Sequence, residues 1–241
     1  MAHAPALSQP ANIPAGPSRG RDLAEIAIAY ALILVVIWTP RPWQRYLWVL
    51  AAAAVVYLTY ISIESLRAMG LRTANFWRSF WIVGAALAVA AVAAVAAAQL
   101  GTLRLPNGIL AFFATYCAYA VWSGVQEFLL QGFFLLRFLR AIPDSRLAIL
   151  TAAALFAAAH LPNPILTPIT FLWAIAACLL FVRYRNVYPL ALAHAILGIA
   201  VAVTIPGPVD HNMRVGLGYL RYNPRVHGHR PYPLEHPLPK P

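Results

Sequence analysis

The stretch ILAFFATYCAYAVWSGVQEFLLQGFFLL, residues 109–136, carries a single charged side chain, Glu127, in an otherwise apolar run. A helix that spans a bilayer needs about 20 mostly apolar residues, and this run exceeds that length. A carboxylate at such depth costs roughly 3 kcal/mol or more, so an intramembrane acid is first treated as a functional group. The stretch therefore predicts a membrane-spanning helix built around Glu127.

The rest of the chain has the composition of a membrane protein. Hydrophobic residue types make up 61% of the 241 residues and charged types only 10%, well below the share that a soluble domain needs for its surface. We expect an all-α, polytopic membrane helix bundle of about seven spans. The expected spans are residues 23–38, 47–63, 80–100, 109–136, 147–161, 165–182 and 188–205.

Composition also divides the chain into four parts. Residues 1–21 are rich in Pro, Ala and Ser and are expected to form a disordered N-terminal tail. Residues 22–108 hold the N-terminal transmembrane helices, and residues 109–205 form a core that carries the polar side chains. Residues 206–241 are expected to be an extramembrane, Pro-rich C-terminal tail.

The formal net charge of +11 comes mostly from arginines at the ends of the expected spans. This placement indicates contact with lipid headgroups and no binding of nucleic acid. The loops on the N-terminal side carry Arg67, Arg72, Arg78, Arg137, Arg140, Arg146, Arg183 and Arg185, against Arg41, Arg45 and Arg104 on the other side. The bias predicts a cytoplasmic N-terminus. The high Ala and Arg content suits a bacterial inner membrane.

Two later spans each hold one internal histidine, His160 and His194. On the expected span 109–136, Ser123, Glu127 and Gln131 are spaced four residues apart, with Gln126 beside them. These side chains form a polar stripe that faces the bundle. Asn163 follows His160 between two prolines and offers an amide donor.

One carboxylate and two imidazoles suit the activation of water. Glu127 could accept a proton, His160 could orient the water or protonate a leaving amine, and His194 could stabilise an oxyanion. The same three side chains could instead bind zinc, since two His and one Glu form a known catalytic ligand set. A structural alternative is that all three only join helices through hydrogen bonds.

At these residues the sequence resembles the CAAX protease and bacteriocin-processing (CPBP, or Abi) family of intramembrane endopeptidases. The family has Glu-Glu-x-x-x-Arg on one helix, Phe-x-x-x-His on the next, and His-x-x-x-Asn or Asp on a later one. The corresponding runs here are 126–131, 156–160 and 194–198, in the same order. The resemblance covers roughly residues 109–205 and implies that this part is the catalytic core.

This chain is a divergent member in three places. Gln126 stands where the family has its first Glu, which is implied to activate water. Gln131 replaces the Arg, and Gly198 replaces the Asn or Asp that supports the oxyanion, whereas Phe156 and both histidines are kept. A primary amide does not accept a proton near neutral pH, so Glu127 must take over the role of base. Asn163 or Gln126 would then supply the missing oxyanion donor.

The leading hypothesis is an intramembrane endopeptidase of the CAAX prenyl protease type, without a metal, that cleaves membrane-tethered or prenylated peptides. A second hypothesis is a degenerate, non-catalytic member that binds a membrane protein or a prenyl chain. The third is a proton-coupled transporter with a Glu–His relay. No inverted repeat supports the third hypothesis, so it ranks last.

Overall fold

The computed structural model describes residues 18–61 and 65–223, and within these ranges the chain forms helices and no strand, as predicted. Within these ranges each expected span overlaps a helix, although the helix of the fifth span ends at Ala158 and leaves His160 in the turn that follows. The elements are α1 (Arg19–Trp38), α2 (Arg41–Ile61), α3 (Phe76–Ser79), α4 (Trp81–Gln99), α5 (Ile109–Glu127), the π-helix η1 (Phe128–Leu135), α6 (Leu136–Ala141), α7 (Ser145–Ala158), α8 (Leu166–Tyr184), α9 (Tyr188–Thr204), α10 (Gly207–Asp210) and α11 (Gly216–Leu220).

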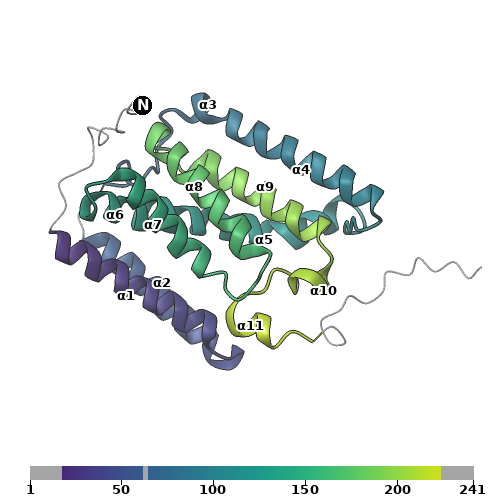
Figure 1. Cartoon of the computed structure of the whole chain (residues 1–241), viewed down its shortest axis with the longest axis horizontal. Helices are drawn as coiled ribbons and strands as arrows, with labels where there is room; N and C mark the ends of the chain where they lie inside the picture. The colour runs from purple at the N-terminus through teal and green to yellow at the C-terminus, as the bar shows by residue number, and fades with distance from the viewer. Residues whose placement is uncertain (1–17, 62–64, 224–241) are drawn as a thin grey trace, which may run out of the picture.

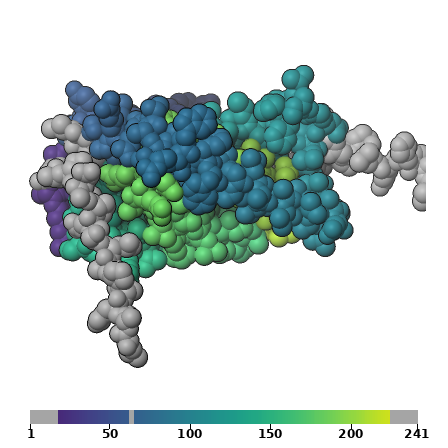
Figure 2. Space-filling model, turned by 90° about the horizontal axis from the view of Figure 1, so that it is seen from above, coloured from purple at the N-terminus to yellow at the C-terminus, as the bar shows by residue number. Residues whose placement is uncertain are grey.

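The helices lie in three groups (Figure 1). The hairpin of α1 and α2 covers one side of the molecule, and α4 covers the opposite side. Between them lie α5, α7, α8 and α9, which are the helices that carry the candidate residues. In the space-filling view the segment that includes α4 lies along the green surface of the later helices (Figure 2), in agreement with the packing of α4 on α9.

Among the residues that the structure describes, four helical stretches are long and apolar enough to cross a membrane: 41–61, 76–99, 109–141 and 166–184. Two further apolar helices, α7 and α9, are shorter. The first helix begins at Arg19, inside the predicted N-terminal tail, because the Ser18 hydroxyl accepts a hydrogen bond from the Arg21 backbone N–H and caps the helix. The rest of that predicted tail, residues 1–17, lies outside the described residues.

The long helix that starts at Ile109 changes its winding directly after Glu127. Residues 128–135 form a π-helix, and from Leu130 to Leu139 every side chain is buried. Phe133 and Leu136 are therefore interior residues, because η1 and α6 run through the middle of the bundle against α1, α7 and α8. Segments of π-helix are uncommon and often lie at functional sites.

Buried ion pairs connect α1 to this central helix. Arg137 is 0% exposed, and its Nε and Nη2 atoms both donate to Glu25 Oε2, at 2.9 and 2.8 Å. Arg140 donates from Nε to Asp22 Oδ2 and from Nη2 to Asp22 Oδ1, one turn earlier on α1. The prediction that Arg137 and Arg140 are loop charges is therefore wrong, since carboxylates on α1 draw both guanidinium groups into the bundle.

Residues 206–223, the first part of the predicted extramembrane tail, fold back onto the bundle. Asn163 Nδ2 donates to the backbone oxygens of Asp210 and Arg214, at 2.8 and 3.1 Å. The Gly216 N–H donates to the Leu161 oxygen, and α11 packs on α1. These backbone contacts tie the segment across the end of α7 and α8. The remainder of the predicted tail, residues 224–241, lies outside the described residues.

Candidate active site

The Glu127 carboxylate lies at the centre of a hydrogen-bonded cluster that joins three helices. Its side chain is 0% exposed, and its Oε1 atom accepts from Trp173 Nε1 on α8 at 2.7 Å and lies 2.9 Å from His194 Nδ1 on α9. Its Oε2 atom accepts from Gln131 Nε2 at 3.2 Å. Three donors around one carboxylate offset the cost of burying its charge.

The contact with Glu127 sets the proton positions on His194. A carboxylate oxygen can only accept, so Nδ1 carries the proton and Nε2 holds the lone pair. His194 is 7% exposed, whereas Glu127 has no exposed surface. His194 Nε2 is therefore the atom of the pair that can accept a proton from water, and the buried Glu127 carboxylate is hydrogen-bonded to the opposite side of the imidazole.

Phe156 brings the second histidine to the same place. Its backbone oxygen lies 2.9 Å from His160 Nδ1, which must therefore donate to it and leave Nε2 with the lone pair. The Phe156 ring packs on both imidazoles, with its centroid 5.0 Å from that of His160 and 6.0 Å from that of His194. The structure thus gathers both predicted histidines around one aromatic side chain, each with the same nitrogen available.

The two expected accessory amides have different surroundings. Gln126 lies on the neighbouring face of α5, is partly exposed, and makes no hydrogen bond with Glu127, His160 or His194 within the residues that the structure describes. Asn163 is fully buried, and its side-chain oxygen accepts from the backbone N–H groups of Ile165 and Leu166. Its amide group already donates twice, so Asn163 serves to join the loop after α7 to the C-terminal segment.

The zinc hypothesis does not fit this arrangement. Among the described residues, no group of three or more His, Cys, Asp or Glu side chains is arranged to hold a metal ion. The reason is visible in the cluster, because the His194 nitrogen nearest to Glu127 is bonded to its carboxylate. A shared metal would need both groups to turn toward a common point.

Trp173 is a site residue that the sequence analysis missed. It lies in the middle of α8, far from both ends, where an indole N–H has no water to bond with. Tryptophans in membrane helices are enriched at the interfaces, so a tryptophan at mid-span indicates a buried hydrogen-bond partner. The mid-span position of Trp173 is therefore the feature of the sequence that could have identified it as a site residue.

Replacement of Trp173 by phenylalanine is expected to lower the kcat of the peptide cleavage predicted from the sequence about 10- to 100-fold. Phenylalanine keeps an aromatic ring beside His194 but removes one of the two donors to Glu127 Oε1, and a hydrogen bond to a charged group contributes roughly 1.5–3 kcal/mol. Steady-state kinetics on the variant measure the change. Exposed Trp77, exchanged for phenylalanine in the same way, is the control and should leave kcat unaltered. Equal rates for the two variants would contradict the assigned contact.

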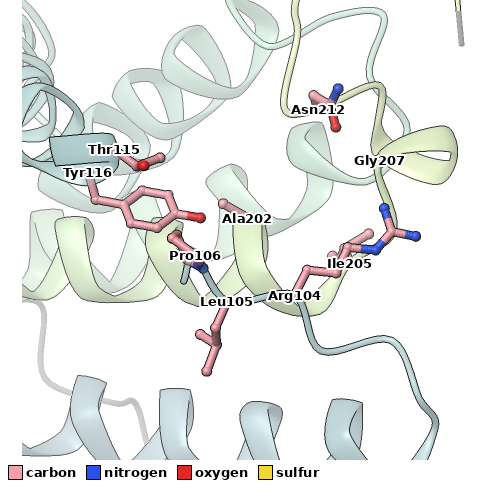
Figure 3. Close-up of a pocket in the computed structure, with 9 residues that line it drawn as sticks. All are labelled: Arg104, Leu105, Pro106, Thr115, Tyr116, Ala202, Ile205, Gly207 and Asn212. Atoms are coloured by element: carbon pink, nitrogen blue, oxygen red, sulfur yellow. The ribbon is translucent and has the colours of Figure 1, made fainter. Parts of the chain in front are cut away.

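A separate cavity of about 150 Å³ opens at the end of the bundle where α5 begins and α9 ends (Figure 3). None of its lining residues belongs to the Glu127 cluster. Tyr116 and Ala202 form its side nearest to the middle of the bundle, and Arg104 and Asn212 lie around the other side. The complete lining is Arg104, Leu105, Pro106, Thr115, Tyr116, Ala202, Ile205, Gly207 and Asn212.

Residues 106–200 match the family model described as Rce1-like, type II CAAX prenyl endopeptidase. This part of the chain is similar to that family. The match starts and ends within five residues of the predicted core, and it contains Glu127, His160 and His194. The resemblance inferred from the three short motifs is thereby confirmed. No curated protein and no solved structure matches the chain.

The Rce1-like match and the apolar helices together make this a membrane protein with a core of the CAAX protease kind. The segments before and after the matched core, which include α1, α2, α4 and α11, add structure of their own around it.

Proposed function

We propose that the protein is an intramembrane endopeptidase that cleaves membrane-tethered or prenylated peptides, with the Glu127–His194 pair as the unit that activates water. The observation that carries the proposal is the fully buried Glu127 carboxylate, 2.9 Å from the imidazole nitrogen of His194. A carboxylate that orients an imidazole and stabilises its protonated form is a recurrent arrangement in hydrolases.

The division of roles follows from the proton positions. Water attacks the carbonyl carbon of the peptide bond, and as its oxygen bonds to carbon one proton passes to His194 Nε2. The same proton then passes to the amine nitrogen as the carbon–nitrogen bond breaks, which leaves a carboxylic acid and an amine. The acid then loses the second water proton to solvent and becomes a carboxylate. Glu127 stabilises the imidazolium in between. His160, with its own Nε2 lone pair, orients the water by accepting a hydrogen bond from it.

This assignment accounts for the departure at Gln126. The sequence alone predicts Glu127 itself as the base, because an amide at position 126 cannot accept a proton. With His194 as the proton acceptor, the site needs only one carboxylate, and neither Gln126 nor Gln131 has to be charged.

The degenerate, non-catalytic alternative is less well supported. A protein that only bound a prenyl chain would need no carboxylate to orient a buried imidazole, and it would gain little from a cluster that spans α5, α8 and α9. Burial of a charged carboxylate is costly even when the carboxylate is hydrogen-bonded. Its presence therefore favours a chemical use.

We further propose a bacterial inner membrane with the start of α1 on the cytoplasmic side. With Arg137 and Arg140 buried, six of the eight arginines counted on that side remain, namely Arg67, Arg72, Arg78, Arg146, Arg183 and Arg185. They still outnumber Arg41, Arg45 and Arg104 at the other end. Arg214 and Arg221 narrow this bias to six arginines against five.

Cleavage of a panel of prenylated peptides by the full-length protein in detergent tests the proposal. Wild type and Q126A should cleave, E127A and H160A should not, and a chelator should have no effect. Chelator-sensitive cleavage would replace the proposed mechanism with a metal-dependent one. A folded wild-type protein that binds the peptides but cleaves none would favour the non-catalytic alternative.

A further inference from the structure

The helix α9 lacks a side chain at a place that a tyrosine of α5 occupies. Gly198 lies on α9 one turn after His194, and a Cβ atom built at this position would overlap the hydroxyl oxygen of Tyr119. The same Cβ would lie 2.5 Å from ring atom Cζ of that tyrosine. Only glycine at 198 therefore leaves room for the hydroxyl at this point, directly beside the turn that carries His194.

Tyr119 belongs to the same face of α5 as the site. Tyr119, Ser123 and Glu127 are spaced four residues apart, so they follow one another along one side of the helix. This side packs along α9 in the antiparallel sense, since a Cβ at Gly124 would lie 4.0 Å from that of Ala191 while Tyr119 meets Gly198.

The seam between α5 and α9 thus connects the site with the cavity of Figure 3. Tyr116 and Ala202, which line the cavity, each lie one turn beyond Tyr119 and Gly198 on the same two helices. The Tyr119 hydroxyl lies between the cavity and the Glu127–His194 pair.

We propose that Tyr119 is a further catalytic residue, whose hydroxyl donates a hydrogen bond to the carbonyl oxygen of the scissile bond as that oxygen becomes an oxyanion. The inference rests on the proposed function. A neutral donor fixed in a site without bulk water stabilises such a charge strongly, because it needs no reorganisation when the charge develops.

Apart from the partly exposed Gln126 amide on the neighbouring face of α5, the other donors of the site are already committed to acceptors in the protein. Trp173 Nε1 and Gln131 Nε2 donate to Glu127. The Asn163 amide donates to two backbone oxygens, and His160 Nδ1 to a third. The Tyr119 hydroxyl has Ser123 as its neighbour, whose own hydroxyl donates to the Tyr119 backbone oxygen. A neutral serine oxygen is a weaker acceptor than an oxyanion, so the phenol can turn to the substrate.

The first test is Y119F, which keeps the ring and removes only the donor. We expect kcat to fall about 10²- to 10³-fold with KM unchanged, because the interaction forms only in the transition state. The thermal midpoint should stay that of wild type. A loss of stability with unaltered kcat would instead assign Tyr119 a packing role and overturn the inference.

A second pair of variants moves the donor from one helix to the other. Y119A removes the side chain that fills the space at position 198, and Y119A/G198N supplies an amide donor from α9 in its place. We expect the double variant to recover at least about 10-fold of the kcat lost in Y119A, as replacement of a single oxyanion donor requires. Y119A/G198A is the matched control, since it fills space without a donor and should recover nothing.

The outcomes separate this inference from the proposed function. If Y119F cleaves as fast as wild type while E127A is inactive, Tyr119 is not a donor and the endopeptidase assignment stands. Recovery in Y119A/G198A equal to that in Y119A/G198N would show that packing alone matters, and would also overturn the inference. A wild-type protein that cleaves no peptide overturns the proposed function and removes the inference with it.

Discussion

E127Q is expected to lower kcat about 10³- to 10⁴-fold while the protein stays folded. The amide oxygen of a glutamine can still accept from Trp173 Nε1 and His194 Nδ1, as Oε1 of the glutamate does. The amide nitrogen of the introduced glutamine would face Gln131. Among the described residues Gln131 Oε1 is buried without a hydrogen-bond partner, and it can accept from that nitrogen once the Gln131 side-chain amide flips. Only the negative charge that stabilises a protonated His194 is lost, and removal of such a carboxylate has effects of this size.

Single-turnover kinetics with a cleavable peptide measure the loss, and a thermal unfolding scan checks the fold. Q126A is the matched control, because position 126 lies on the adjacent face of α5 and makes no hydrogen bond with the cluster in the described part of the chain. It should stay within about threefold of wild type, as expected for a side chain without a site partner. An inactive Q126A beside an active E127Q would place the chemistry on the other residue and refute the assignment.

The helices could be predicted because apolar length and proline breaks decide where a membrane span begins and ends. The gathering of Glu127 with His194 was predictable for a similar reason, since a carboxylate inside a membrane must find a polar partner and few were available. The approach of His160 follows from Phe156, whose backbone oxygen and ring hold the imidazole.

Other features depend on contacts that spacing along the chain does not show. The polar stripe was derived for a regular α-helix, and the π-helix after Glu127 turns the residues that follow it into an interior position. The sequence does not single out Trp173 and Tyr119, because the use of their polar atoms depends on particular partners on α5 and α9. Nothing within the run 137–140 indicates that its arginines pair with acids more than 100 residues earlier.

These buried pairs lead to the largest expected effect on stability. E25A should lower the free energy of unfolding by about 3–5 kcal/mol, because it leaves the fully buried Arg137 guanidinium without its carboxylate. Arg137 Nη1 also donates to the Phe133 backbone oxygen in the π-helix, so the segment after Glu127 should loosen first. Chemical denaturation of the detergent-solubilised protein measures the loss, and hydrogen exchange of residues 128–135 locates it.

Two variants show whether the unpaired charge is the cause. R21A removes a second ion-pair partner of Glu25. The Arg21 side chain is 40% exposed, and an exposed pair contributes at most about 1 kcal/mol. E25L/R137M removes both buried charges together, and since apolar residues of similar volume often replace a buried pair without loss, it should recover most of the stability lost in E25A. A double variant as unstable as E25A would mean that E25A destabilises the protein through loss of the Glu25–Arg137 ion pair, and not through burial of an Arg137 charge that has lost its carboxylate. The ion pair itself would then hold α1 against the helix that positions Glu127.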